Sequence, residues 1–477
     1  MDEQKIIHPN PAKVRIVSSA GQPTQDLEPK LEEQERKIQT LQKFLEFNIG
    51  FDMVIGAVLL FVVIFLVAWR FDLIGYFQKD GSQSTSQGLP TITTPVIASE
   101  DQTPPYVFIN EQGINVEETF EAPANDLKLT VSGQLKKEVL GFLPYWVIDK
   151  SSEIDISLLT SVSYFGLEVD GSGNIIKTDA SGKAIDPWYH FSSNPKFDEF
   201  IKRAKRNKTK IYVTLKCFNQ ANIIKLVTDS KSSTNFINNA LYLMNSKSLD
   251  GINVDFEYIG TPDQKVIDGF SVLITNLNRE LKREYPSAKL TVDTFIDAAS
   301  ATRIHDIPVL SQNSDGIVIM GYDFHTPNSS SAGPVAPIEG AGLSIKGLMA
   351  SYLEKSPPEK LILAVPYYGY DWPVVSARNS QVAGSRADVR IYPYAVIAES
   401  SRNSQINWDS DSMTPWYMYT DSQSLQARMV HFENPRSLGI KYDFINQKDL
   451  AGVGIWALGY DGKRTDLWQL IADKFAN

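Results

Sequence analysis

The sequence predicts an α/β fold: a (β/α)₈ or TIM barrel, preceded by a single transmembrane helix and a flexible linker. Eight short apolar runs alternate with longer amphipathic stretches between residues 138 and 477. Strands that alternate with helices favour a parallel sheet, and eight repeats fit a closed barrel. An uncharged apolar run lies upstream, and a segment rich in Ser, Thr, Gln, Gly and Pro separates it from the repeats.

Composition limits the classes of partner. The chain has 477 residues and a formal net charge of −10, which argues against a nucleic-acid partner, because phosphate binding needs a basic face. An acidic glycan is also disfavoured as a purely electrostatic target. The single cysteine, Cys217, excludes an intrachain disulfide and a zinc site of several thiolates; we expect it to be a small buried hydrophobe. The five histidines show no ligand spacing, and no Gly-rich phosphate loop occurs, so we expect no metal and no cofactor.

An apolar run near the N-terminus predicts a membrane anchor. Residues 53–69 carry no charge, and flanking phenylalanines extend the run, so we expect a transmembrane helix over 51–71. A soluble helix would show a polar stripe, and this run shows none. Basic residues are more frequent before the run than after it, at Arg36, Lys37 and Lys43. This bias predicts a cell-membrane protein with a cytoplasmic N-terminus and an extracytoplasmic C-terminal domain.

Residues 1–50 are expected to form a cytoplasmic segment with a short amphipathic helix. Leu31, Ile38 and Leu45 recur every seven residues in a stretch rich in Glu, Gln, Lys and Arg. Two interpretations fit this spacing. One is a juxtamembrane coiled coil that makes a weak homo-oligomer through residues 27–48, and the other is a lone helix on the membrane surface.

Residues 72–137 are expected to be a linker. The Ser-, Thr-, Gln-, Gly- and Pro-rich composition from residue 79 to about 105 is typical of a flexible spacer. Farther along, apolar and polar residues alternate over 127–131, which indicates a small β element.

The barrel domain is expected to span residues 138–477. Helices are expected over 195–205 and 263–285, and the longest connection, about 85 residues between the seventh and eighth strands, predicts an inserted or elaborated loop. The eight predicted strands are 139–147, 161–167, 210–218, 249–257, 289–296, 316–322, 361–367 and 452–458.

The strand over 249–257 carries unusual polar residues. Side chains alternate between the two faces of a strand, so its apolar residues share one face and its polar residues the other. The polar set, which we expect to point into the barrel, is Asn253, Asp255 and Glu257. A barrel interior is normally apolar, and buried carboxylates are costly unless they are hydrogen-bonded and used. Glu257 also lies at the carboxyl end of the strand, where such barrels hold their active sites.

Two carboxyl groups on one strand face predict a shared proton. In a partly dry interior both cannot ionise cheaply, so we expect one of the two pKa values to be raised. A protonated Glu257 beside an ionised Asp255 would supply the acid that glycosidic cleavage needs. The alternative is a structural hydrogen-bond network at the end of a strand.

The octapeptide DGINVDFE resembles the DxxDxDxE signature of glycoside hydrolase family 18, the chitinase family. Asp250, Asp255 and Glu257 match the first Asp, the last Asp and the Glu. Asn253 replaces the middle Asp, as in a branch that includes the spore-cortex-lytic N-acetylglucosaminidases. The resemblance runs from about residue 139 to 477 and includes Gly141-Phe142, Met320-Gly321-Tyr322-Asp323, the segments 332–337 and 366–370, and Gly454-Ile455-Trp456.

The resemblance implies a retaining, substrate-assisted mechanism. Glu257 would act as general acid and then as base, while the 2-acetamido oxygen of the sugar attacks. Asp255 would hold the acetamide N–H, and Tyr322 would donate to the acetamide oxygen. Trp456 would form the apolar floor under the sugar ring.

Further substrate-binding positions follow from the same resemblance: Asp323, Met320 and Phe142. Asn253 could hydrogen-bond Asp255 but cannot take a proton, so we expect an altered pH dependence.

The predicted activity is therefore hydrolysis of β-1,4-linked glycans that contain N-acetylglucosamine. A chitinase-like binding protein that has lost catalysis is the first alternative, and a passive scaffold the second. Chitin, peptidoglycan and N-glycan cores all carry the required acetamido group; the anchor and the cortex-lytic resemblance favour a cell-envelope glycan. Endo and exo cleavage both remain open.

Overall fold

The computed structural model describes residues 114–125 and 127–476. The predicted cytoplasmic segment, the transmembrane helix over 51–71 and most of the linker lie outside these residues. Within the described part, we find no helix that combines the length and the apolar character needed to span a bilayer.

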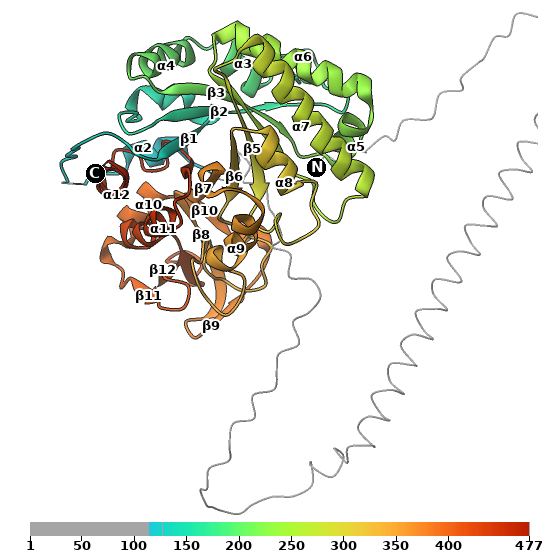
Figure 1. Ribbon diagram of the computed structural model, residues 1–477. Coiled ribbons are helices and arrows are strands. Elements are labelled where there is room, and N and C mark those ends of the chain that lie inside the picture. The colour runs from blue at the N-terminus through green and yellow to red at the C-terminus, as the bar shows by residue number, and fades with distance from the viewer. Residues whose placement is uncertain (1–113, 126, 477) are drawn as a thin grey trace, which may run out of the picture. The chain divides into compact units, whose positions relative to one another are not determined.

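Eight parallel strands close into a barrel, in the order β1-β14-β7-β6-β5-β4-β3-β2 (Figure 1). All eight predicted strands are confirmed, with shifts of a few residues at their ends. The barrel strands are β1 Glu138–Pro144, β2 Ser161–Glu168, β3 Lys210–Cys217, β4 Gly251–Phe256, β5 Lys289–Phe295, β6 Gly316–Met320, β7 Leu361–Pro366 and β14 Gly452–Trp456.

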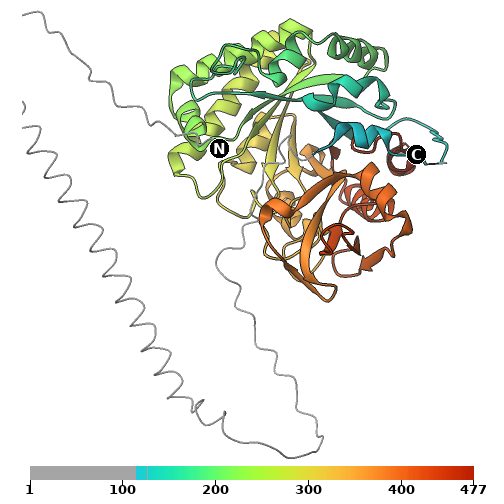
Figure 2. The ribbon, with the colours of Figure 1, turned by 180° about the vertical axis from the view of Figure 1, so that it is seen from behind.

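Helices surround the barrel (Figures 1 and 2), and the two predicted helices are confirmed as α4 and α7. In α7 the buried residues recur every three or four positions, which places them on one face against the strands; they are Val266, Phe270, Leu273, Ile274, Leu277 and Leu281. The helices of this layer are α3 Asp186–Ser192, α4 Pro195–Arg206, α5 Gln220–Thr228, α6 Ser230–Lys247, α7 Gln264–Glu284, α8 Ile307–Asn313, α9 Ile345–Lys355, α11 Pro435–Gln447 and α12 Asp466–Phe475, with 3₁₀ turns η3 Tyr145–Glu153 and η4 Pro358–Lys360.

The predicted alternation in β4 is confirmed by its contacts. The Phe256 ring lies 5.6 Å from that of Phe236 in α6 and 5.8 Å from that of Phe270 in α7, centroid to centroid. The Asn253 side chain lies on the opposite face, fully buried between β3 and β5. One face of β4 thus packs under the helices, and the other lines the barrel interior.

The long connection between β7 and β14 folds into a second sheet beside the barrel (Figure 2), which confirms the predicted insertion. Its strands run β10-β8-β13-β12-β11, with β9 paired to β8, all antiparallel. A small core packs against one face: Ile397, Tyr417, Val430 and Phe432. The elements are β8 Tyr368–Ser376, β9 Asn379–Val382, η5 Arg386–Asp388, β10 Arg390–Pro393, α10 Tyr394–Ser400, η6 Ser401–Asn403, β11 Asn407–Asp409, β12 Thr414–Thr420 and β13 Ala427–His431.

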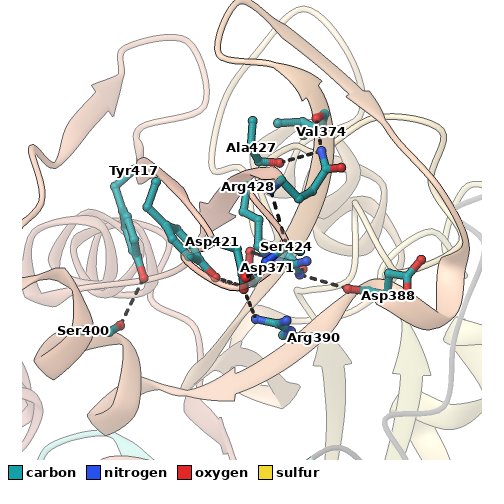
Figure 3. Close-up of polar contacts among 12 residues, drawn as sticks. Asp371, Val374, Asp388, Arg390, Ser400, Tyr417, Asp421, Ser424, Ala427 and Arg428 are labelled. Carbon is teal, nitrogen blue, oxygen red and sulfur yellow. Dashed lines mark hydrogen bonds and ion pairs between the residues drawn. The ribbon is translucent and has the colours of Figure 1, made fainter.

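A buried ion pair joins β8 to β13 in this inserted sheet. Arg428 Nε lies 2.9 Å from Asp371 Oδ1, with both side chains almost completely buried. The Tyr419 hydroxyl donates to Asp371 at 2.7 Å, and Arg428 also donates to the carbonyl oxygens of Asp371 and Asp388 (Figure 3). The charges are therefore both neutralised and hydrogen-bonded, the condition under which burial is tolerated.

The described part of the linker packs on the C-terminal helix. Helix α2 (Val116–Glu121) buries Phe120. The expected β element at 127–131 is wrong: the N–H and C=O of Thr130 pair with the side-chain amide of Gln469 in α12 instead of with another strand. Because a side chain satisfies the hydrogen bonds of this backbone, the alternating residues 127–131 pair with no second strand.

The buried ion pair gives a stability prediction. Replacing Arg428 with Met leaves the Asp371 carboxylate buried without its cation, so we expect a loss of about 3–5 kcal/mol of unfolding free energy. The matched control is Arg390→Met, which removes an ion pair to Asp421 whose arginine is 46% exposed; its expected cost is below about 1 kcal/mol. Urea denaturation followed by tryptophan fluorescence measures both. Equal losses of unfolding free energy in the two variants would contradict the larger stabilising role assigned to the buried Arg428–Asp371 pair.

Candidate active site

Polar side chains gather at the carboxyl ends of four barrel strands. Asn253, Asp255 and Glu257 come from β4 and its end, and Asp293 comes from β5. Tyr322 and Asp323 follow β6, and Trp456 ends β14. These ends meet at one rim of the barrel because the strands are parallel, and this is the rim where such barrels place catalytic groups.

Asn253 is held by the strands on both sides of β4. Its Nδ2 donates to Asp293 Oδ2 at 2.7 Å and to the Thr214 hydroxyl at 3.3 Å. Its Oδ1 accepts from the Thr291 hydroxyl at 2.6 Å. The expectation that Asn253 hydrogen-bonds Asp255 is therefore wrong: the two side chains share a face of β4 but lie two residues apart along it, and partners on β3 and β5 take both hydrogens of the Asn253 amide.

The acidic side chains raise one another's pKa values. Burial raises the pKa of Asp255 to about 7, against the opposing effect of the Lys216 ammonium. Burial and the neighbouring Asp255 raise the pKa of Asp293 well above its usual range, against the opposing effect of the hydrogen bond from Asn253. The pKa of Glu257 is raised by burial first and then by Asp255, Asp293 and Asp323. These carboxyl groups cannot all be ionised together, so the site retains protons at neutral pH.

Glu257 is the member of this group that is open to a ligand. Its side chain is half-buried, whereas Asp255 and Asp293 are buried. One oxygen of Asp255 and one of Asp293 have no hydrogen-bond partner in the described chain. The site thus combines a half-buried carboxyl of raised pKa with two buried carboxylate oxygens that have no hydrogen-bond partner among the described residues.

Asp293 was not among the residues predicted from the sequence. In β5 the apolar residues Leu290 and Val292 alternate with Thr291 and Asp293, so the polar pair shares the interior face. An acidic residue at an inward position of a predicted barrel strand is visible in the sequence, and this signal could have identified Asp293 as a candidate site residue.

Asp323 is fixed from the inserted sheet. The hydroxyls of Tyr368 and Tyr370, both in β8, donate to Asp323 Oδ1, the second at 2.9 Å. Asp323 has a backbone φ of 60°, a left-handed conformation that Asp tolerates better than most residues. Burial raises the pKa of Asp323 to about 7, although the two hydroxyls oppose the shift. Tyr322 is half-buried, with its ring 6.2 Å from that of Tyr368.

Trp456 lies in an aromatic cluster. Its ring centroid is 4.5 Å from that of Phe165, 5.8 Å from that of Phe142 and 6.5 Å from that of Trp146. Indole and phenyl faces of this kind form the apolar platforms on which sugar rings stack. Phe142 and Trp456 are both buried, at 3% and 7% exposed, and Met320 is half-buried at the end of β6.

Comparisons with known proteins agree with this geometry. The model of "Glycosyl hydrolases family 18" matches residues 138–461. The putative sporulation-specific glycosylase YdhD of Bacillus subtilis (strain 168) is 22% identical over 69% of this chain and 74% of its own length. The cortical fragment-lytic enzyme of Bacillus anthracis is 24% identical over 52% of this chain, which spans only 55% of that protein.

A solved structure shows the same fold. The family 18 chitinase from Cycas revoluta, in complex with (GlcNAc)₃, superposes with a TM-score of 0.61 at 19% identity, over 71% of this chain and 99% of the chitinase. The family model covers well over half of the chain, including every strand of the barrel. The chain therefore belongs to glycosyl hydrolase family 18, and its barrel is that of a glycosidase.

Proposed function

We propose that the barrel domain hydrolyses β-1,4-linked N-acetylglucosamine-containing glycans with retention, by substrate-assisted catalysis. The observation that carries this proposal is Glu257: a half-buried carboxyl whose pKa is raised by burial and by three nearby carboxyls. An acid that holds its proton at neutral pH is what departure of a sugar oxygen requires.

In the first step Glu257 protonates the glycosidic oxygen, and the sugar's own acetamide oxygen attacks the anomeric carbon. Asp255 accepts the acetamide N–H and orients the group. Tyr322 donates its hydroxyl to the acetamide oxygen as charge develops. Water then opens the oxazolinium intermediate with Glu257 as base, which restores the original anomeric configuration.

The platform and the rim hold the sugar during these steps. The face of Trp456 stacks under the ring at the cleaved bond. Asp323, fixed by two tyrosine hydroxyls, binds the distorted sugar, and Met320 contacts it from the end of β6.

Asp293 supplies the second carboxyl that Asn253 lacks. Asn253 cannot hold a proton, but its amide donates to Asp293, and Asp293 raises the pKa of Glu257. A proton on Asp293 leaves Asp255 ionised, as acetamide binding requires, because the two carboxyls disfavour each other's charge.

A cell-envelope glycan is the favoured substrate. The names of two relatives refer to sporulation and to lysis of cortical fragments, and the predicted transmembrane segment at 51–71, with its uncharged run 53–69, is suited to anchoring the domain outside the cytoplasm. Chitin remains the second substrate class, since a chitinase with the same fold holds (GlcNAc)₃.

Glu257→Gln tests the reaction. The amide keeps the shape of the side chain but cannot donate the proton, so kcat/KM on 4-methylumbelliferyl N-acetylglucosamine oligomers should fall by roughly 10²–10⁴-fold. Affinity for the unlabelled oligomers, measured by calorimetry, should persist. Turnover by the Gln variant at the wild-type rate would refute the proposal. Binding without turnover by the wild type would instead identify a carbohydrate-binding protein.

The acidic cluster predicts the pH dependence. Glu257 must be protonated to act, so kcat/KM is lost as pH rises through its pKa. Asp293→Asn removes a carboxyl that raises this pKa, and the alkaline limb should move to lower pH. Asn253→Asp adds a carboxyl on the same face and should move that limb to higher pH. pH–rate profiles that coincide with that of the wild type for both variants would rule out this sharing of charge.

The anchor gives a localisation prediction. Deleting residues 51–71 from the full chain should move glycosidase activity from the membrane pellet to the soluble fraction, because the deletion removes the apolar segment. In the intact chain, protease added outside the cell should digest the barrel domain. Activity that pellets equally with and without 51–71 would contradict the anchor.

A further inference from the structure

A lysine stands among the acidic side chains of the site. Lys216 lies on β3 in register with Asp255 of β4, and its side chain is half-buried. Its stem lies beside Gly166 of β2, where an added Cβ would be in ordinary van der Waals contact with Lys216 Cδ, at 3.6 Å.

Aromatic rings hold the ammonium group. Lys216 Nζ lies 5.2 Å from the centroid of the Phe165 ring and 5.3 Å from that of Phe218, distances typical of cation–π contacts. The Phe165 ring also lies edge-on to Trp456, at 4.5 Å. The ammonium and the proposed sugar platform therefore share Phe165 as a neighbour.

Lys216 differs from the other buried cations of the domain. Arg303, Arg428 and Lys441 each form an ion pair with a buried carboxylate, at 2.7, 2.9 and 2.7 Å. Within residues 114–125 and 127–476, the contacts of Lys216 are the two phenyl rings, with no ion pair or hydrogen bond to a side chain. Its three N–H donors thus have no acceptor among the described side chains, and an ammonium that is partly removed from water gains most from a carboxylate acceptor.

Asp255 does not fill that requirement. Lys216 lowers the pKa values of both Asp255 and Glu257 through space, but the ammonium is held over the rings and forms no ion pair with either carboxyl in the described chain. The free donors beside the platform indicate an acceptor that arrives with the ligand.

We infer that Lys216 is a specificity-determining residue that binds a carboxylate on the glycan, at a sugar next to the N-acetylglucosamine whose linkage is cleaved. This inference rests on the proposed function and names a substrate class within it: anionic glycans, whose carboxylate belongs either to an O-lactyl ether, as in muramic acid, or to a uronic acid. The net charge of −10 disfavours such a ligand at long range, and Lys216 supplies the local exception. Neutral chitin offers this ammonium only hydroxyl and carbonyl oxygens and no carboxylate.

The test compares matched tetrasaccharides with the full-chain protein. Four substrates are used: chitotetraose, an alternating N-acetylglucosamine–muramic acid tetrasaccharide, the same compound with its lactyl carboxyls converted to methylamides, and an alternating N-acetylglucosamine–glucuronic acid tetrasaccharide. The readout is the ratio of kcat/KM for each carboxylate substrate to that for the methylamide. Any effect of Lys216 on Asp255 acts on all four substrates and cancels in the ratio.

Lys216→Met keeps the apolar stem and removes the charge, so we expect the ratio to fall by about tenfold or more. Lys216→Arg keeps the charge and should retain most of the preference. If the kcat/KM ratio of only one carboxylate substrate depends on Lys216, that substrate identifies the carboxylate that Lys216 binds, from muramic acid or from glucuronic acid. A ratio that is equal in wild type and Lys216→Met for both acids overturns the inference while leaving the proposed glycosidase intact.

Binding separates the two failures. In the Glu257→Gln background, calorimetry on the same four compounds should show tighter binding of a carboxylate compound than of the methylamide, and Lys216→Met should remove the difference. Absence of turnover by the wild type would overturn the proposed function, yet this difference in affinity would still support the role of Lys216. Equal affinities with and without Lys216 would overturn it.

Discussion

Asn253 donates a hydrogen bond to Asp293 of the neighbouring strand β5, inside the barrel, at 2.7 Å, and this contact influences how the acidic side chains share charge. An amide at this position cannot take a proton, and as a donor it favours the ionised form of Asp293 against the effects of burial and Asp255. The carboxyl next to Asp255 is therefore supplied by β5 instead of by position 253 of β4. Asp293 also raises the pKa of Glu257. The buried hydrogen bond between Asn253 and Asp293 therefore bears on the protonation of Glu257, the half-buried carboxyl of the site.

The inserted sheet fixes the other side of the site. Tyr368 and Tyr370 lie on one face of β8, and their hydroxyls donate to Asp323 at the barrel rim. Asp371, the next residue along β8, points to the opposite face and pairs with Arg428. Alternation along this strand therefore directs the two tyrosines to the rim and Asp371 to the ion pair. The insertion thus holds a residue of the candidate site, although its sheet lies outside the barrel.

Local patterns in the sequence were sufficient for the eight barrel strands and for the polar face of β4, because alternation and run length are recorded within each segment. Contacts between segments were not readable in this way. Asp293 and Lys216 become site residues only when closure brings β5 and β3 against β4. The stretch 127–131 was misread for the same reason, since its partner, Gln469, lies far along the chain. Asp250 belongs to the family signature, yet it accepts from the Ile211 N–H at the amino end of β4, far from Glu257.

Net charge and local charge lead to different conclusions about the ligand. The whole chain carries a formal net charge of −10. Salt screens most of its effect beyond about a Debye length, roughly 8–10 Å. Recognition at the rim therefore depends on groups within that distance of the ligand. There, the raised pKa values of the acidic side chains reduce their negative charge, and the Lys216 ammonium adds a positive charge. A substrate carboxylate near Phe165 would therefore meet less repulsion than the formal charges suggest. The raised pKa values of Asp293 and Glu257 would then have two effects under the proposed function: they would favour a proton on the acid, and they would limit the negative field that an anionic glycan encounters.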